Sequence, residues 1–168
     1  MFDPDTLALA ERVLAACRTR GWHLATAESC TGGLVAAALT AVADSSDVVE
    51  RGFVTYSNAA KEEMLGVRAE TLARHGAVSE EAAREMALGA LSRSRASVAF
   101  AITGIAGPSG GSAAKPVGTI CLAWALKGGA PRSETRHFAG DREAVRRQAV
   151  ERALAGVLEL LDESPRRA

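Results

Sequence analysis

A short segment rich in hydroxyl groups and glycine has residue types suited to nucleophilic chemistry. Residues 27–33 read Ala-Glu-Ser-Cys-Thr-Gly-Gly, and they follow an apolar run and precede a helix-like pattern. Ser29 could attack a substrate there, because the unpaired N–H groups at the start of a helix attract anions. The structural alternative is that Ser29 or Thr31 simply caps the helix, while the two glycines let it pack closely on the strand.

Helix-forming and strand-forming patterns alternate along the chain and must position this segment. Apolar spacing, turn formers and capping residues predict helices over 7–17, 31–43, 58–65, 80–91 and 142–161, and strands over 23–28, 51–57, 97–102, 117–126 and 132–138. A loop rich in glycine and proline is predicted over 103–116, and the last two strands form a predicted hairpin. This order predicts an α/β fold, a single-domain mixed β-sheet with helices on both faces. We expect the domain to cover 1–163, with a loose tail over 164–168.

The composition argues against several classes of protein. Lysine and arginine total 20, as do aspartate and glutamate, so the formal net charge is +0 and a nucleic-acid partner is not expected. No apolar stretch approaches the roughly 18 residues of a membrane span, and no secretory signal is evident, so we expect a cytoplasmic protein without a membrane partner. The 3 cysteines and 3 histidines lack metal-ligand spacing, and no metal or other cofactor is expected. The oligomeric state is left open, a homo-oligomer included.

The predicted sheet brings reactive side chains from three strand ends to one edge. Ligands of α/β sheets bind at the carboxyl ends of the parallel strands. Ser29 follows the first predicted strand. Tyr56 and Lys61 follow the second, and Thr103 follows the third. Ser46 is a rival nucleophile, but roughly 20 Å of predicted helix separates it from Ser29, which we therefore favour within one protomer.

Lys61 is the available base for the serine. A serine hydroxyl is a weak nucleophile unless a base removes its proton, and no histidine stands where a triad would need it. This role requires that the lysine pKa, ordinarily near 10.4, is lowered by burial or by a neighbouring cation. On spacing alone, a solvated helix lysine beside Glu62 and Glu63 is the more common arrangement. Cys30 is a second candidate nucleophile, with a small core residue as its other interpretation.

Six motifs follow one another along most of the chain, from about Leu7 to Leu161. They are 27–33, 52–58 with Lys61, 75–80, 103–111, 115–119 and 140–142. Together they resemble the CinA C-terminal domain family, the PncC-type nicotinamide-nucleotide amidohydrolases. The resemblance implies hydrolysis of nicotinamide mononucleotide to nicotinate mononucleotide and ammonia, a salvage reaction, with a serine and a lysine and without metal. The other interpretations are a non-catalytic nucleotide-binding module and a competence-related interaction protein.

Matching these motifs residue by residue implies a set of active-site positions, without deciding which serine is the nucleophile. The positions are Ser29, Ser46, Tyr56, Lys61, Thr103 and Arg142. In the resulting mechanism Ser29 attacks the carboxamide and Lys61 moves the proton. The oxyanion would be bound by backbone N–H groups of Cys30 and Thr31 or by the Thr103 hydroxyl.

The same resemblance implies contacts to the small-molecule nucleotide substrate. The segment 104–111, with Gly104 and Gly107, is expected to shape its pocket through exposed backbone amides, and Gly32 is expected to contact it. Arg142 is available for the phosphate, with a helix start beside it, and Tyr56 is expected to face the pyridine ring.

Overall fold

A computed structural model describes residues 2–164, so residues 165–168 of the predicted tail lie outside the described residues. This range contains the strands β1 (Leu24–Glu28), β2 (Val49–Val54), β3 (Val98–Gly104), β4 (Thr119–Leu126) and β5 (Arg132–His137). It also contains the helices α1 (Pro4–Thr19), α2 (Leu34–Thr40), α3 (Asn58–Leu65), α4 (Ala69–His75), α5 (Glu80–Ser92) and α6 (Arg142–Glu163), and a short 3-10 helix, η1 (Ser45–Asp47).

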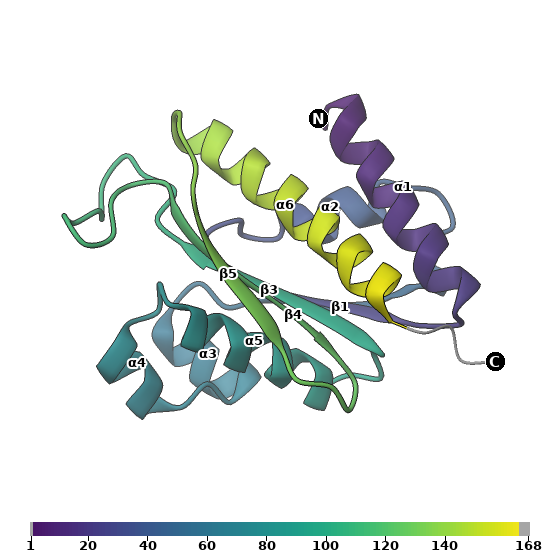
Figure 1. The fold of residues 1–168 in the computed structure, drawn as a ribbon, viewed down its shortest axis with the longest axis horizontal. Coiled ribbons are helices and arrows are strands. Elements are labelled where there is room, and N and C mark those ends of the chain that lie inside the picture. Colours follow the sequence, from purple (N-terminus) through teal and green to yellow (C-terminus); the bar gives the residue numbers. More distant parts are fainter. Residues whose placement is uncertain (1, 165–168) are drawn as a thin grey trace.

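The strands form one mixed sheet in the order β2-β1-β3-β4-β5. Strand β1 pairs in parallel with β2 and β3, so the carboxyl ends of these three strands meet at one edge. Strand β4 runs antiparallel to both of its neighbours, and β4 with β5 forms the predicted hairpin. Helices α1, α2 and α6 cover one face of the sheet, and α3, α4 and α5 cover the other (Figure 1). The predicted α/β sheet with helices on both faces is confirmed. None of the helices within 2–164 has the length and apolar character needed to cross a membrane.

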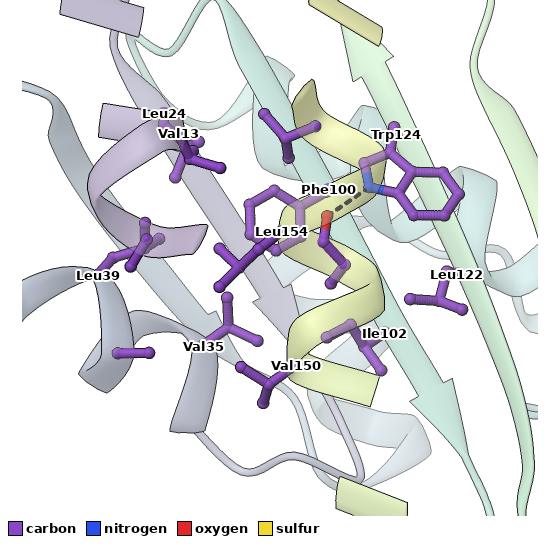
Figure 2. Packing of buried hydrophobic residues seen from close by; sticks show 14 of the residues in the cluster. Val13, Leu24, Val35, Leu39, Phe100, Ile102, Leu122, Trp124, Val150 and Leu154 are labelled. Carbon is purple, nitrogen blue, oxygen red and sulfur yellow. Dashed lines mark hydrogen bonds between the residues drawn. The ribbon is translucent and has the colours of Figure 1, made fainter. Parts of the chain in front are cut away.

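Large side chains fill the face covered by α1, α2 and α6, which we call the large-residue face. Alternate strand residues, among them Phe100, Ile102 and Trp124, pack there against the apolar sides of these helices (Figure 2). The Trp124 Nε1–H donates a hydrogen bond of 2.9 Å to the carbonyl oxygen of Ala153 in α6. Burial of these side chains supplies the main hydrophobic stabilisation of the domain.

Alanine dominates the opposite face, covered by α3, α4 and α5, which we call the small-residue face. Strand residues between the large ones, such as Ala99 and Ala101, meet alanines of α5 there. Small side chains let the backbones approach closely. At Gly89 of α5, an added Cβ would overlap the carbonyl group of Leu65 at the end of α3. The alternation of large and small residues along each strand therefore gives the two faces different packing distances.

The predicted helix over 31–43 is wrong at its start and too long, since α2 spans only Leu34–Thr40. Gly32 and Gly33 have φ values of 60° and 97°, a left-handed conformation that cannot continue a helix. Neither predicted cap is used: Gly33 occupies the N-cap position and offers no side-chain cap. The 7 residues of α2 span about 10 Å at 1.5 Å per residue, so this helix accounts for only half of the roughly 20 Å expected between Ser29 and Ser46.

The loop predicted to begin at Thr103 begins two residues later. Thr103 pairs with Cys121 and Gly104 pairs with Ile120, so the ladder with β4 extends β3 to Gly104. Strand β4 starts at Thr119, which leaves residues 105–118 as the connection. Thr103 and Gly104 are consequently held by a strand rather than by the loop.

Candidate active site

Ser29 directly follows β1 and is 8% exposed. Its backbone N–H donates to the carbonyl oxygen of Ile102 at 2.9 Å, which continues the β1–β3 ladder by one residue. Side chains alternate along a strand, and Ala25 and Ala27 belong to the small-residue face. Ser29 therefore points toward the same face, where α3 lies.

Lys61 meets Ser29 from the first turn of α3. That helix begins where the Ser57 hydroxyl accepts the backbone N–H of Ala60 at 3.0 Å. The Lys61 side chain is only 1% exposed, and its Nζ lies 3.0 Å from Ser29 Oγ and 2.7 Å from the carbonyl oxygen of Thr55. The interpretation of Lys61 as a solvated helix lysine is wrong. Consecutive residues of a helix point in different directions, and here Lys61 is buried while Glu62 is exposed.

Burial changes the acid–base character of Lys61. Removal from water lowers the pKa of its ammonium from the ordinary value of 10.5, since desolvation disfavours the charged form. Within residues 2–164 no carboxylate forms an ion pair with it to oppose this shift. A neutral Nζ can accept the Ser29 hydroxyl proton across the 3.0 Å contact. The pair has the geometry of a nucleophile and its base.

Cys30 does not share this activation. Its side chain is 5% exposed and belongs to the core of the large-residue face. Burial raises the pKa of its thiol to about 12, so the thiol stays protonated near neutral pH. The structure favours the interpretation of Cys30 as a small core residue.

Thr103 approaches the site with its hydroxyl already engaged. Thr103 Oγ1 donates a 2.8 Å hydrogen bond to the carbonyl oxygen of Ala77, and the side chain is 1% exposed. The hydroxyl is thus not a free oxyanion donor in this conformation. The glycine at 104 has a packing cause, since an added Cβ would come within 2.6 Å of the Thr119 carbonyl oxygen.

The turn after Ser29 offers two backbone donors. The N–H of Gly32 is taken by the carbonyl oxygen of Ser29 at 3.0 Å, so this predicted contact to a ligand is not available. The N–H groups of Cys30 and Thr31 have no acceptor in the described part of the chain. They are the donors closest in sequence to Ser29, which suits an oxyanion site.

Glu28 is a site residue that sequence reasoning missed. Its carboxylate is 1% exposed and accepts hydrogen bonds from the Thr31 hydroxyl and from the backbone N–H groups of Gly33, Val35 and Ala36, at 2.7 to 3.1 Å. The helix start that looked open to anions is therefore filled by the protein's own carboxylate. A glutamate at the end of a strand buried at every position was the available signal, because buried carboxylates need partners.

Arg146 is a second missed residue. It projects from α6 and its Nη2 donates to the carbonyl oxygen of Thr31 at 2.9 Å. It thereby links α6 to the turn after Ser29. Since it lies 115 positions from Thr31 and carries no motif, no local pattern in the sequence pointed to this contact.

Arg142 joins three segments at the mouth of the site. Its Nη1 donates to the carbonyl oxygen of Gly107 at 2.7 Å, and its Nη2 donates to Tyr56 Oη at 3.0 Å. Tyr56 itself is 61% exposed. Asp141 caps α6 by accepting the N–H of Ala144 at 2.9 Å, so a carboxylate stands where the helix start was expected to attract phosphate. The guanidinium remains, with donors left over from these two contacts.

These groups surround a cavity of about 290 Å³. Eight of the predicted residues line it: Ser29, Cys30, Tyr56, Lys61, Thr103, Gly104, Gly107 and Arg142. Thr31, Gly32 and Ser46 do not line it, and Ser46 lies exposed on η1. The other lining residues within the predicted segment 104–111 are Ile105, Ala106, Ser109 and Gly110. Asn58, Ala77 and Val78 also line the cavity and were not singled out from the sequence. Across 2–164, no group of three or more histidine, cysteine, aspartate or glutamate side chains could hold a metal ion.

Known proteins resemble this chain over most of its length. The family model described as the CinA C-terminal domain matches residues 6–161. Nicotinamide-nucleotide amidohydrolase PncC of Escherichia coli (strain K12) is 55% identical over 154 residues, covering 92% of this chain and 93% of that protein. The protein of that name from Pseudomonas putida is 51% identical over 158 residues, covering 94% and 98%. The crystal structure of competence/damage inducible protein CihA from Agrobacterium tumefaciens is similar with a TM-score of 0.92 at 49% identity, covering 97% of this chain and 99% of that chain.

Proposed function

The chain belongs to the CinA C-terminal domain family, and from this membership and the Ser29–Lys61 geometry we propose that it hydrolyses nicotinamide mononucleotide to nicotinate mononucleotide and ammonia. The relatives named nicotinamide-nucleotide amidohydrolase, at 55% and 51% identity, support the substrate class. The observation that carries the proposal is the 3.0 Å contact between a buried serine hydroxyl and a buried lysine amine.

The first half-reaction forms an acyl-enzyme. Ser29 Oγ attacks the carboxamide carbon while neutral Lys61 Nζ takes the hydroxyl proton. The carbon–nitrogen bond then breaks, and Lys61 returns that proton to the leaving nitrogen, which departs as ammonia. The electron-withdrawing pyridinium ring makes the carbonyl carbon more susceptible to attack. The nicotinoyl group remains as an ester on Ser29.

The second half-reaction restores the serine. A water molecule attacks the ester, with Lys61 accepting its proton, and the bond to Ser29 Oγ breaks as that oxygen regains a proton. Nicotinate mononucleotide leaves. In both halves the negative carbonyl oxygen needs a donor, and we assign to it the N–H of Cys30, the unpaired donor of the turn whose residue lines the cavity. Removal of one such donor typically costs about 3 kcal/mol of transition-state stabilisation.

Arg142 is the group that we assign to the 5′-phosphate. A charge-assisted contact is worth roughly 1.5 to 3 kcal/mol, so Arg142→Ala should raise KM for the mononucleotide by about 10- to 100-fold with a smaller change in kcat. Nicotinamide riboside is the matched control, because it lacks the phosphate. Its kcat/KM should scarcely change, and an equal loss for both substrates would mean that Arg142 supports the fold or the chemistry instead.

Product analysis tests the proposed function. Incubation of the purified protein with nicotinamide mononucleotide should release ammonia and yield nicotinate mononucleotide by chromatography. Because the mechanism uses only Ser29 and Lys61, turnover should persist in EDTA. Binding of the mononucleotide without any acid product would instead support a non-catalytic nucleotide-binding module, the alternative that the buried base does not favour.

A further inference from the structure

Glu28 and Ser29 are adjacent in sequence, and their side chains point to opposite faces of the sheet. Ser29 faces α3, whereas the Glu28 carboxylate faces α2 on the large-residue face and bonds to the backbone of Val35 and Ala36. In Figure 1, α2 lies on the same side of the sheet as α6, away from α3. The carboxylate therefore holds the turn after Ser29 without touching the cavity.

We propose that Glu28 is a positioning residue for the hydrolysis proposed above, on which this inference rests: its carboxylate fixes the turn of residues 29–33 so that Ser29 and the N–H of Cys30 keep their positions at the cavity. Glu28 touches no reacting atom. It acts through Thr31 and Gly33, which follow the nucleophile by two and four positions.

The hydrogen bonds of Glu28 hold the turn of residues 29–33 from the side of α2. One carboxylate oxygen accepts the Thr31 hydroxyl at 2.7 Å and the N–H groups of Gly33 and Val35 at 3.0 and 3.1 Å, and the other accepts Ala36 N–H at 2.9 Å. Hydrogen bonds to an ionised acceptor are about twice as strong as neutral ones. Within residues 29–33, the N–H groups of Ser29, Gly32 and Gly33 therefore all have acceptors inside the protein. The N–H groups of Cys30 and Thr31 are left without one.

Arg146 fixes the turn from the other side. Its guanidinium donates to the Thr31 carbonyl oxygen at 2.9 Å, while the hydroxyl of the same residue donates to Glu28. Thr31 is fully buried between the two. Its carbonyl shares a peptide plane with the Gly32 N–H, which donates to the Ser29 carbonyl oxygen at 3.0 Å, so holding Thr31 at its side chain and its carbonyl also holds the turn against Ser29.

Glu28→Gln is the direct test. The amide keeps one oxygen but presents its NH₂ donor to at least one backbone N–H, that of Ala36. It also removes the charge that strengthens all four hydrogen bonds, so the turn is held less firmly. We expect kcat for nicotinamide mononucleotide to fall by about 100-fold, the usual size of an effect from sub-ångström to 1 Å misplacement, with KM little changed. Because an unfolded fraction would also lower the apparent kcat at unchanged KM, kcat is expressed per folded molecule, with the folded fraction measured by circular dichroism on the same sample.

Glu85→Gln is the matched control. Glu85 also accepts a threonine hydroxyl and a backbone N–H near a helix start, from Thr71 at 2.6 Å and Arg68 at 2.8 Å, but it lies outside the cavity. Both variants should lower the melting temperature. Only Glu28→Gln should lower kcat, and equal kcat in the two variants would overturn the inference.

A substrate-independent readout separates this inference from the proposed function. The rate at which phenylmethylsulfonyl fluoride labels Ser29, measured by intact mass, reports on the serine and its turn. Slower labelling of Glu28→Gln than of Glu85→Gln supports the positioning role even if the wild type releases no ammonia from the mononucleotide. Unchanged labelling together with unchanged kcat contradicts it.

Substitutions of Thr31 give a second test should Glu28→Gln fail to fold. Thr31→Val removes one hydrogen bond to Glu28 and should lower kcat by about tenfold, the equivalent of one hydrogen bond. Thr31→Ser keeps the donor and should restore most of that loss. If Thr31→Ser and Thr31→Val are equally impaired, the methyl group rather than the bond to Glu28 matters, and the inference is wrong.

Discussion

On the large-residue face, Phe100, Trp124 and their neighbours fill the space between the sheet and α1, α2 and α6. On the small-residue face, alanines hold α5 close to the strands, and the proposed nucleophile and base meet there. Both faces belong to the same strands, since successive residues alternate between them. The difference indicates that one face holds the large apolar side chains, whereas the proposed nucleophile and base meet on the other. The large-residue face reaches the site through Glu28 and Arg146, which hold the turn after Ser29.

Removal of the nucleophile should have the largest effect on activity and should leave the stability of the domain nearly unchanged. Ser29→Ala is expected to lower kcat by about 10⁴-fold or more, because a serine and its base act as a unit. The melting temperature should stay near that of the wild type, since only one hydroxyl is lost. If Ser29→Ala retains near-wild-type kcat and Ser46→Ala does not, the assignment of the nucleophile to this face is wrong.

One glycine on each face allows the packing of both faces to be disturbed in the same way. An added Cβ at Gly89 would overlap the Leu65 carbonyl of α3, and one at Gly156 of α6 would overlap the ring of Trp124. Alanine at either position should lower the free energy of unfolding by about 1 to 3 kcal/mol through overpacking.

Only one of these variants should affect turnover. Gly89→Ala pushes on the helix that carries Lys61 and should lower kcat by about 100-fold, whereas Gly156→Ala should leave kcat unchanged at temperatures where both are folded. Denaturant titration and steady-state kinetics on the same samples measure both quantities. Similar kcat values for the two variants would contradict the division of labour between the faces.

Replacement of the buried base should trade activity for stability. Lys61→Met should abolish turnover and raise the free energy of unfolding by about 1 to 4 kcal/mol, because a buried charge without an ion partner is replaced by an apolar chain. The folded pKa of Lys61 lies below 10.5, so its burial cost is complete below that folded pKa and vanishes as pH rises toward 10.5. The stabilisation measured by denaturant titration should shrink over the same range, and a gain that grows with pH would contradict the lowered pKa.

The smallest expected effect is on the large-residue face. Trp124→Phe removes the hydrogen bond to the Ala153 carbonyl and should lower the free energy of unfolding by about 1 kcal/mol. Its kcat should equal that of the wild type. A loss of kcat here would show that the packing of α6 on the sheet reaches the active site.

Local signals in the sequence predicted the parts of the fold that depend on local contacts. Helix α3 was predicted at its observed bounds, and α5 begins where Ser79 caps it, because a side-chain cap lies within three residues of its partner. The start of α2 was not predicted, since its cap is Glu28, which lies before the turn and bonds to residues up to eight positions away.

The site was predictable to the same extent. The strand-end rule and the family resemblance brought Ser29, Lys61 and Arg142 together, and all three line the cavity. The burial of Lys61 could not be predicted from its charged neighbours, because it depends on how α3 packs against the sheet. The contact of Arg146 with Thr31 joins residues 115 positions apart and depends on the whole fold.

The pairing of α1 with α6 has a consequence for the growing chain on the ribosome. Arg20 Nη2 donates to the carbonyl oxygen of Leu161 at 2.8 Å, so the large-residue face closes only when segments 141 positions apart have met. Domains are synthesised from the N-terminus at about 5 to 20 residues per second, so α6 becomes available many seconds after Ser29 and Lys61. Until then Thr31 lacks its contact with Arg146 and Tyr56 lacks Arg142. The contacts that hold the turn after Ser29 and the mouth of the cavity are therefore among the last in the domain to form.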